Sequence, residues 1–199
     1  RYGRRDFVLL SLLYDSGARV QELIDLTPPN IEFNDTATVK LCGKGNKARI
    51  VPLSKQQASK NKKYMYDEGL MKEDRHCVPI FCNFHGEKLS RVAVLNIVKK
   101  YAEIARKKSP DLIPENLGCH SFRHSKAMHL LEADINLVYI RDFLGHVSTT
   151  TTEIYARASE KKKLEALSRV NPGIIKEGKT TWQKDKSLLG YLKDLRTKY

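Results

Sequence analysis

One short segment of the sequence holds two side chains that could together bind a phosphate group and move a proton. Residues 119–124 read Cys-His-Ser-Phe-Arg-His, so His120 and Arg123 lie three positions apart. On a helix this spacing places both side chains on one face. An imidazole can carry a proton at neutral pH, and a guanidinium can hold two oxygens of one phosphate. The segment is therefore a candidate site for an anion.

A second candidate is the arginine that follows the break at Gly17. Arg19 lies in an apolar stretch, where an arginine is costly unless it is paired or held against an anion. Glu22 lies three residues further on, on the same helix face. Two interpretations stay open: an ion pair between Arg19 and Glu22, which the spacing alone favours, and a phosphate clamp that Glu22 supports.

A third region combines a glycine, a histidine and a tyrosine. Gly145 predicts a helix end, which would leave His146 at an exposed turn. The threonine run at 149–152 favours a cap or an extended link over a long helix. Tyr155 follows in polar sequence, where a purely structural tyrosine is common. Nothing about Tyr155 taken alone identifies a nucleophile.

The apolar pattern predicts a mainly helical frame for these residues. Helices are expected over 5–14, 18–26, 54–73, 90–107, 121–133, 136–144 and 159–169. Strands are expected over 30–33, 37–42, 48–53 and 79–82, and the first three should form a small sheet whose turn at 43–47 is strongly basic. The predicted fold class is mainly α with a small antiparallel β-sheet (α+β).

Composition favours a nucleic-acid partner. The 199 residues carry 36 Lys and Arg against 23 Asp and Glu, a formal net charge of +13. A polyanion attracts such a chain, and the charge is spread along the sequence instead of forming the single basic amphipathic helix typical of membrane-surface binding. No apolar run approaches the roughly 18 residues that a membrane-spanning helix needs.

The cysteines and histidines do not form a standard metal or disulfide pattern. The cysteines are Cys42, Cys77, Cys82 and Cys119, and no paired spacing predicts disulfides, which favours a reducing cytoplasm. His76, Cys77, Cys82 and His85 form a loose cluster, but its spacing matches none of the usual zinc motifs. The apolar residues around it favour a short buried strand, and no metal site is expected.

In order along the chain, these segments resemble the tyrosine recombinases, also called the phage integrase family. The resemblance rests on Ser-Gly-Ala-Arg-Val-Gln-Glu-Leu around Arg19, on His-Ser-Phe-Arg at 120–123, and on Leu-Gly-His at 144–146 followed nine residues later by Tyr155. The hairpin Gly-Lys-Gly-Asn-Lys-Ala-Arg-Ile-Val-Pro-Leu is similar to the family's β-hairpin with its catalytic lysine. The resemblance runs from about residue 4 to 170.

The resemblance implies a fold and a role for each matching residue. Residues 1–173 are expected to form a tyrosine recombinase catalytic domain, and 174–199 a tail that docks on a neighbouring protomer or folds back on its own domain. The implied catalytic residues are Arg19, Lys44, His120, Arg123, His146 and Tyr155, with Glu22 in support. The implied DNA-binding residues of the hairpin are Lys44, Lys47 and Arg49. For the catalytic lysine, Lys44 is favoured over Lys47.

The implied activity is site-specific recombination of double-stranded DNA. Tyr155 would form a 3′-phosphotyrosine intermediate, with no metal or other cofactor, in a homotetramer that is cytoplasmic and associates with the nucleoid when bound to DNA. The length of the tail beyond Tyr155 favours a mobile-element integrase over a chromosome-dimer resolvase. Nothing in the chain matches the family's N-terminal core-binding domain, so an isolated catalytic domain is expected.

Three alternatives remain open at this point. A type IB topoisomerase shares the tyrosine chemistry but would relax supercoils instead of exchanging strands. A recombinase relative without activity would be a DNA-binding module. A basic nuclease would use His120 together with a metal ion, although no cluster of Asp and Glu suited to such an ion is evident.

Overall fold

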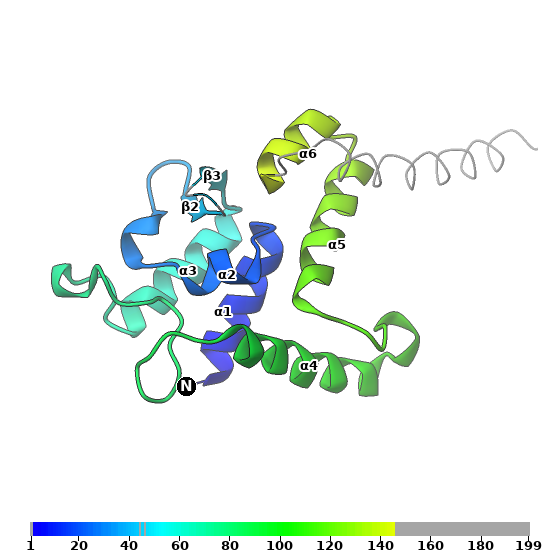
Figure 1. Cartoon of the computed structure of the whole chain (residues 1–199), viewed down its shortest axis with the longest axis horizontal. Helices are drawn as coiled ribbons and strands as arrows, with labels where there is room; N and C mark the ends of the chain where they lie inside the picture. The colour runs from blue at the N-terminus through cyan, green and yellow to red at the C-terminus, as the bar shows by residue number, and fades with distance from the viewer. Residues whose placement is uncertain (1, 44, 46, 146–199) are drawn as a thin grey trace, which may run out of the picture. The chain divides into compact units, whose positions relative to one another are not determined.

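A long amphipathic helix opens the chain and supplies much of its core. The computed structural model describes residues 2–43, 45 and 47–145, and within them α1 spans Tyr2–Asp15 (Figure 1). Its buried apolar residues recur at helical spacing, so one stripe of the helix faces the interior. They are Val8, Leu9, Leu12 and Leu13. α1 contacts both α3 and α5, and its buried stripe belongs to the main hydrophobic cluster.

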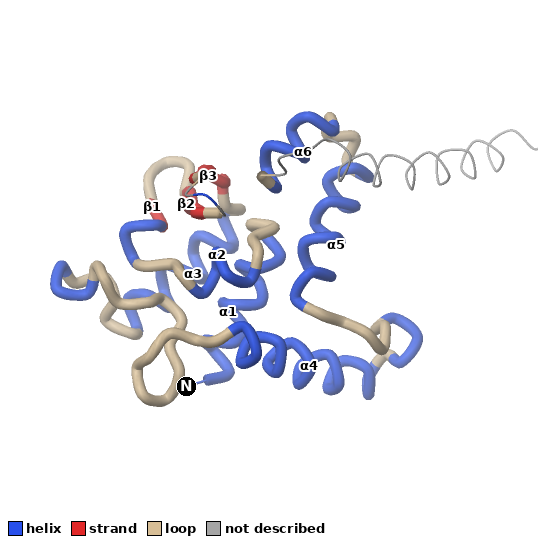
Figure 2. Tube along the Cα trace, in the orientation of Figure 1, coloured by secondary structure: helices blue, strands red, loops and turns tan. Residues whose placement is uncertain are grey.

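A short helix and a small sheet follow α1. α2 spans Val20–Ile24, and a 3-10 turn at Pro28–Asn30 follows, as expected where two prolines stop a helix. The strands are β1 (Ile31–Glu32), β2 (Thr38–Cys42) and β3 (Ala48–Pro52). They form one antiparallel sheet in the order β1-β2-β3, drawn in red in Figure 2.

Two capped helices and a loop continue the frame. α3 spans Lys55–Asp67, and α4 spans Arg91–Lys108. Each is preceded by a serine whose hydroxyl accepts a backbone N–H three residues further on. This bond satisfies one of the N–H groups left unpaired at a helix start. Between α3 and α4 lies a 3-10 turn at Glu73–Arg75, and after α4 another at Pro110–Leu112.

The last described helices pack on each other. α5 spans Cys119–Glu132, and α6 spans Leu137–Leu144. They share a second, smaller hydrophobic cluster, formed by Ala127, Leu131, Ile140 and Leu144. α6 begins after Asn136, whose side chain accepts the Val138 N–H at 2.9 Å. α5 also contacts α1, so the helix that carries His120 and Arg123 is held against the main core.

The predicted fold class is confirmed, and the main errors lie at element ends. The helix expected over 54–73 ends at Asp67, because Gly69 has a φ of +68° and the chain turns there. The helix expected over 18–26 shrinks to Val20–Ile24. The strand expected over 79–82 is reduced to a single bridge between Cys82 and Lys88. The helix expected over 159–169 and the proposed boundary at 173/174 lie outside the described residues.

No helix in the described part of the chain is both long and apolar enough to cross a membrane.

Candidate active site

The carboxyl end of α6 is the point at which the predicted site is organised. The helix ends at Leu144, and Gly145 adopts a left-handed conformation with φ +65° and ψ +46°, as the sequence predicts for a helix end. The last carbonyls of a helix have no partner within it, and they form the negative end of its dipole. This helix end therefore attracts cationic hydrogen-bond donors.

Three arginines from three other elements donate to successive carbonyls at this helix end. Arg49 Nε donates to the Phe143 oxygen at 3.0 Å, Arg123 Nη2 to the Leu144 oxygen at 2.5 Å, and Arg19 Nη2 to the Gly145 oxygen at 3.3 Å. The arginines come from β3, from α5 and from the start of α2 respectively. Guanidinium groups far apart in the sequence are thus gathered around one turn of backbone.

Arg19 stands immediately before the first residue of α2. Its backbone N–H donates to Glu22 Oε2 at 2.8 Å, and its Nη1 donates to Glu22 Oε1 at 2.9 Å. The predicted ion pair is therefore confirmed. The side chain of Arg19 is nevertheless 39% exposed, so the pair leaves part of this side chain accessible from solvent. The phosphate-clamp role stays a prediction.

Glu22 is a buried carboxylate shared by two arginines. It is only 3% exposed, and it accepts from Arg19 and from both Nη atoms of Arg49, at 2.8 Å each. Burial raises the pKa of Glu22, but hydrogen bonds from Arg49 and Arg19, together with the charge of Arg49, outweigh burial and lower the pKa from 4.5 to about 2. Gly43 lies beside this carboxylate, and a Cβ there would come within 3.2 Å of Glu22 Oε1.

Arg123 is the buried member of the arginine set. It is 5% exposed, and besides the Leu144 carbonyl it binds the Gly17 carbonyl at 2.6 Å. Gly17 has a φ of +57°, and a Cβ on it would lie 2.9 Å from Leu144 Cδ2. Arg123 thus ties the turn between α1 and α2 to the end of α6. Sequence spacing alone does not reveal this buried position.

The other predicted site residues fall into two groups. His120 lies in the first turn of α5, on the same helix as Arg123, and it is exposed. Lys47 is exposed at the base of the hairpin turn, where its carbonyl accepts the Gly43 N–H at 2.9 Å. Lys44, His146 and Tyr155 lie outside the described residues, so their roles stay predictions.

Arg49 is held by protein contacts, and its expected role in DNA binding stays a prediction. Its Nε, Nη1 and Nη2 all donate to protein oxygens, and its side chain is only 13% exposed. A signal for this was present in the sequence. Arg49 lies two residues before Val51, so both side chains occupy the same face of β3, and Val51 is fully buried.

Among the described residues, no group of three or more His, Cys, Asp or Glu side chains could hold a metal ion. The loose cluster of His76, Cys77, Cys82 and His85 is fully described, and it forms no such group. The cysteines of this part of the chain are unpaired, and burial raises the pKa of Cys82 and of Cys119.

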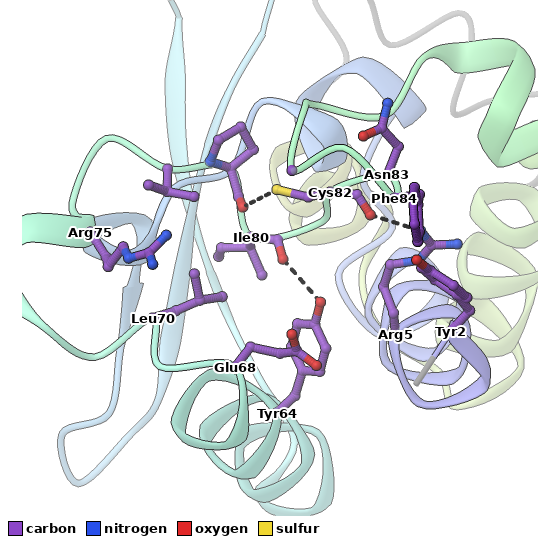
Figure 3. A pocket seen from close by; sticks show the side chains of 13 residues that line it. Tyr2, Arg5, Tyr64, Glu68, Leu70, Arg75, Ile80, Cys82, Asn83 and Phe84 are labelled. Atoms are coloured by element: carbon purple, nitrogen blue, oxygen red, sulfur yellow. Dashed lines mark hydrogen bonds between the residues drawn. The ribbon is translucent and has the colours of Figure 1, made fainter.

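A separate hollow of about 250 Å³ lies at the opposite end of α1 from Gly17 (Figure 3). Tyr2 and Arg5 of the first turns of α1 line it, together with Tyr64 and the loop that carries Cys82. Arg5 Nη1 donates to the Cys82 carbonyl at 2.7 Å, and the Tyr64 hydroxyl donates to the Ile80 carbonyl at 3.1 Å. These contacts fasten the loop to α1 and α3. None of the predicted site residues that the structure describes lines this hollow.

Comparison with known proteins places this architecture in a family. Residues 2–162 match the phage integrase family. The tyrosine recombinase XerD of Chlorobaculum tepidum is 40% identical over 154 residues, which cover 76% of this chain and 48% of that protein. The tyrosine recombinase XerC of Thermodesulfovibrio yellowstonii is 33% identical over 173 residues, which cover 85% of this chain and 55% of that protein.

Solved structures show the same fold. The XerH site-specific recombinase bound to a palindromic difH substrate, in a post-cleavage complex, superimposes with a TM-score of 0.69 at 26% identity, over 83% of this chain and 45% of that one. The Tn1549 transposon integrase in complex with transposon right-end DNA gives a TM-score of 0.60 at 19% identity, over 82% of this chain and 58% of that one, and shares the fold.

The chain spans about half the length of the curated relatives it matches. The family match covers most of the chain and includes every segment that carries a predicted catalytic residue. The chain therefore belongs to the phage integrase family, the tyrosine recombinases.

Proposed function

We propose that this chain is the catalytic part of a site-specific DNA recombinase that works through a 3′-phosphotyrosine intermediate. The observation that carries the proposal is the convergence of Arg19 and Arg123 on adjacent carbonyls at the end of α6, immediately before His146 in the sequence. Two guanidinium groups at one point can neutralise a phosphate whose negative charge increases during reaction. Membership of the tyrosine recombinase family supports the same assignment.

In the proposed reaction the Tyr155 phenol oxygen attacks the scissile phosphorus. The bond to the 5′-oxygen breaks, and the DNA 3′ end becomes joined to the tyrosine while a 5′-hydroxyl is released. This divides one difficult displacement into two reversible steps, and the covalent link keeps the energy of the phosphodiester for rejoining. The proposed reaction therefore requires no ATP.

The proton transfers are assigned to residues on both sides of the arginines. His120 would assist removal of the tyrosine proton, and Lys44 would protonate the leaving 5′-oxygen. His146 would add a hydrogen-bond donor to the non-bridging oxygens. The exposure of His120 in the first turn of α5 supports its assignment, because a general base must be reachable from outside the protein core.

The proposed partner is a double-stranded DNA recombination site, bound by four copies of the parent protein. The basic charge of +13 and the XerH relative solved on its difH substrate support a DNA partner. Residues 1–173 would be the catalytic domain and 174–199 the docking tail, in a cytoplasmic protein that associates with the nucleoid. Use by a mobile element stays a prediction, since the curated relatives compared above are named as Xer recombinases.

Capture of the covalent intermediate tests the proposal. The full chain is incubated with a pool of nicked suicide duplexes with randomised arms, in EDTA, and protein–DNA adducts that resist detergent are collected. We expect an adduct with the wild-type chain and none with Tyr155→Phe. No adduct with any duplex would indicate a non-catalytic relative. Relaxation of plasmids without a preferred site would indicate a topoisomerase.

A further inference from the structure

The side chain of Arg49 joins three elements of the candidate site. It extends from β3, binds both carboxylate oxygens of Glu22 on α2, and donates through Nε to the Phe143 carbonyl at the end of α6. A forked contact of this kind fixes the plane of the guanidinium as well as its position. Arg49 is therefore placed more firmly than a solvated surface arginine.

Close packing around Arg49 supports the same view. A Cβ on Gly145 would lie 2.9 Å from Arg49 Cδ and 3.0 Å from its Nη1, so the turn after α6 lies directly against this side chain. Arg49 is also paired with Leu41 across the hairpin, and Cys42 with Ala48. The two strands that flank the basic turn at 43–47 are thereby held in place relative to α2 and α6.

The charges at Glu22 give Arg49 a second consequence. Among the described residues the carboxylate faces two cations, Arg19 on its own helix and Arg49 on β3. With both arginines in place, one negative charge is shared by two positive charges, and a net positive charge remains at the site. Without Arg49, Glu22 would neutralise Arg19 alone and hold it more tightly, away from an incoming phosphate.

We propose that Arg49 is a positioning residue that fixes the β-hairpin against the arginine pair and keeps Arg19 available to the scissile phosphate. The proposal rests on the recombinase function proposed above. In it Arg49 makes no contact with DNA. It acts through Glu22 and through the Phe143 carbonyl, the two groups to which Nε, Nη1 and Nη2 donate.

The test compares Arg49→Met and Arg49→Lys with the wild-type full chain in single-turnover cleavage of a suicide duplex at saturating DNA. Lys40→Met is the matched control, because Lys40 is exposed on β2 and loses the same charge from the same sheet. The salt dependence of DNA binding is measured for each protein. Thermal unfolding establishes which variants fold, and Arg49→Lys serves where Arg49→Met does not.

We expect Arg49→Met to cleave about 10- to 100-fold more slowly than wild type, the cost of misplacing a reacting group by about an ångström. Arg49→Lys should recover little of this loss, because an ammonium cannot reproduce the forked contact with Glu22 and the bond to Phe143 together. Lys40→Met should cleave at the wild-type rate, and the salt dependence of binding should be the same in Arg49→Met as in wild type.

A pH profile separates positioning from general damage to the fold. Loss of Arg49 removes a group that lowers the pKa of Glu22, so the pKa of this carboxyl, followed by NMR, should be higher in Arg49→Met than in wild type. Adding Glu22→Gln to Arg49→Met should cost less than the product of the two single effects, because the two residues act through one contact.

Two results would overturn the inference while leaving the recombinase proposal intact. One is cleavage by Arg49→Met at the wild-type rate. The other is full recovery in Arg49→Lys together with a salt dependence in Arg49→Met that is reduced by about one phosphate contact, which would make Arg49 a DNA ligand. Absence of any adduct with the wild-type chain would remove both proposals together.

Discussion

The two arginines proposed to hold the phosphate occupy different environments. Arg19 is 39% exposed and shares its carboxylate partner with Arg49, whereas Arg123 is 5% exposed and binds two backbone carbonyls. Buried carbonyls stabilise a guanidinium without neutralising its charge. Arg123 therefore has a structural role at these two carbonyls besides its proposed role at the phosphate. Loss of either arginine should slow the chemistry, and the loss of Arg123 should also loosen the fold.

Arg19→Ala and Arg123→Ala should each lower the rate of adduct formation at least about a hundredfold, since removal of one donor to a charged transition state typically costs about 3 to 4 kcal/mol. Arg123→Ala should in addition lower the free energy of unfolding by about 1 to 3 kcal/mol, because the Gly17 and Leu144 carbonyls lose their partner. Single-turnover cleavage and urea unfolding measure the two effects.

The control for this pair is Arg4→Ala, which removes an exposed arginine paired with Asp67 on α3. Its cleavage rate should match that of wild type. A rate for Arg19→Ala within threefold of the Arg4→Ala rate would contradict the role given to Arg19.

Glu22 should make stability depend on pH in the acidic range. Its pKa is lowered in the folded chain to about 2, so its contribution is complete above the ordinary value of 4.5 and is lost as pH falls towards 2. The difference corresponds to about 3 kcal/mol of unfolding free energy. Urea unfolding of wild type and Glu22→Gln between pH 2 and 7 measures it, and the variant should lose less stability on acidification. Parallel losses in both proteins would contradict this account.

At the scale of the elements, the turns are what bring the site together. Gly17 and Gly145 both have positive φ, and each lies against a side chain of another element, Leu144 for the first and Arg49 for the second. Both turns therefore need a residue without a Cβ for space as well as for conformation. The first turn joins α1 to α2, and the second follows the end of α6. Arg123 binds a backbone carbonyl at each of these two places.

Gly17→Ala should destabilise the chain more than Gly86→Ala does. Both positions have positive φ, which costs an alanine about 1 to 2 kcal/mol. Gly86 has open space around its position, whereas Gly17 faces Leu144 Cδ2, and overpacking there adds about 1 to 3 kcal/mol. Thermal or urea unfolding of the two variants gives the comparison. Equal destabilisation would show that the Leu144 side chain moves aside without lowering the free energy of unfolding.

Much of this arrangement follows from the sequence alone. Apolar spacing predicts α1, α4 and α6, and glycine predicts the end of α6. Strand-favouring residues on either side of a glycine-rich turn predict the antiparallel hairpin. The pairing of Arg49 with Glu22 does not follow, because the sequence indicates the apolar face of β3 but not which side chain of another element lies against it. The end of α3 at Asp67 is also missed, since the polar sequence beyond it keeps helical propensity up to Gly69.

At the scale of the whole molecule, excess positive charge should dominate binding to DNA of any sequence. The formal net charge is +13, and exposed lysines such as Lys47 contribute to it. Cations that contact phosphates release counterions from DNA, which makes affinity fall steeply with salt. Specific recognition by this chain must be measured above that non-specific background.

Binding to a random-sequence duplex should weaken on a straight line of log affinity against log salt, and Lys47→Met should reduce the slope by about one. Fluorescence anisotropy between 50 and 200 mM salt measures both slopes. An affinity that does not change with salt would contradict the electrostatic account. An unchanged slope in Lys47→Met would place this lysine away from the DNA.

The most direct measurement of the central claim is the chemical identity of the covalent link. Adducts from the suicide duplexes are digested with protease and nuclease, and the nucleotide-bearing peptide is sequenced by mass spectrometry. The account predicts one modified peptide, with the Tyr155 oxygen joined to the phosphate at a DNA 3′ end. Attachment through a 5′-phosphate, or to any residue other than Tyr155, would contradict it.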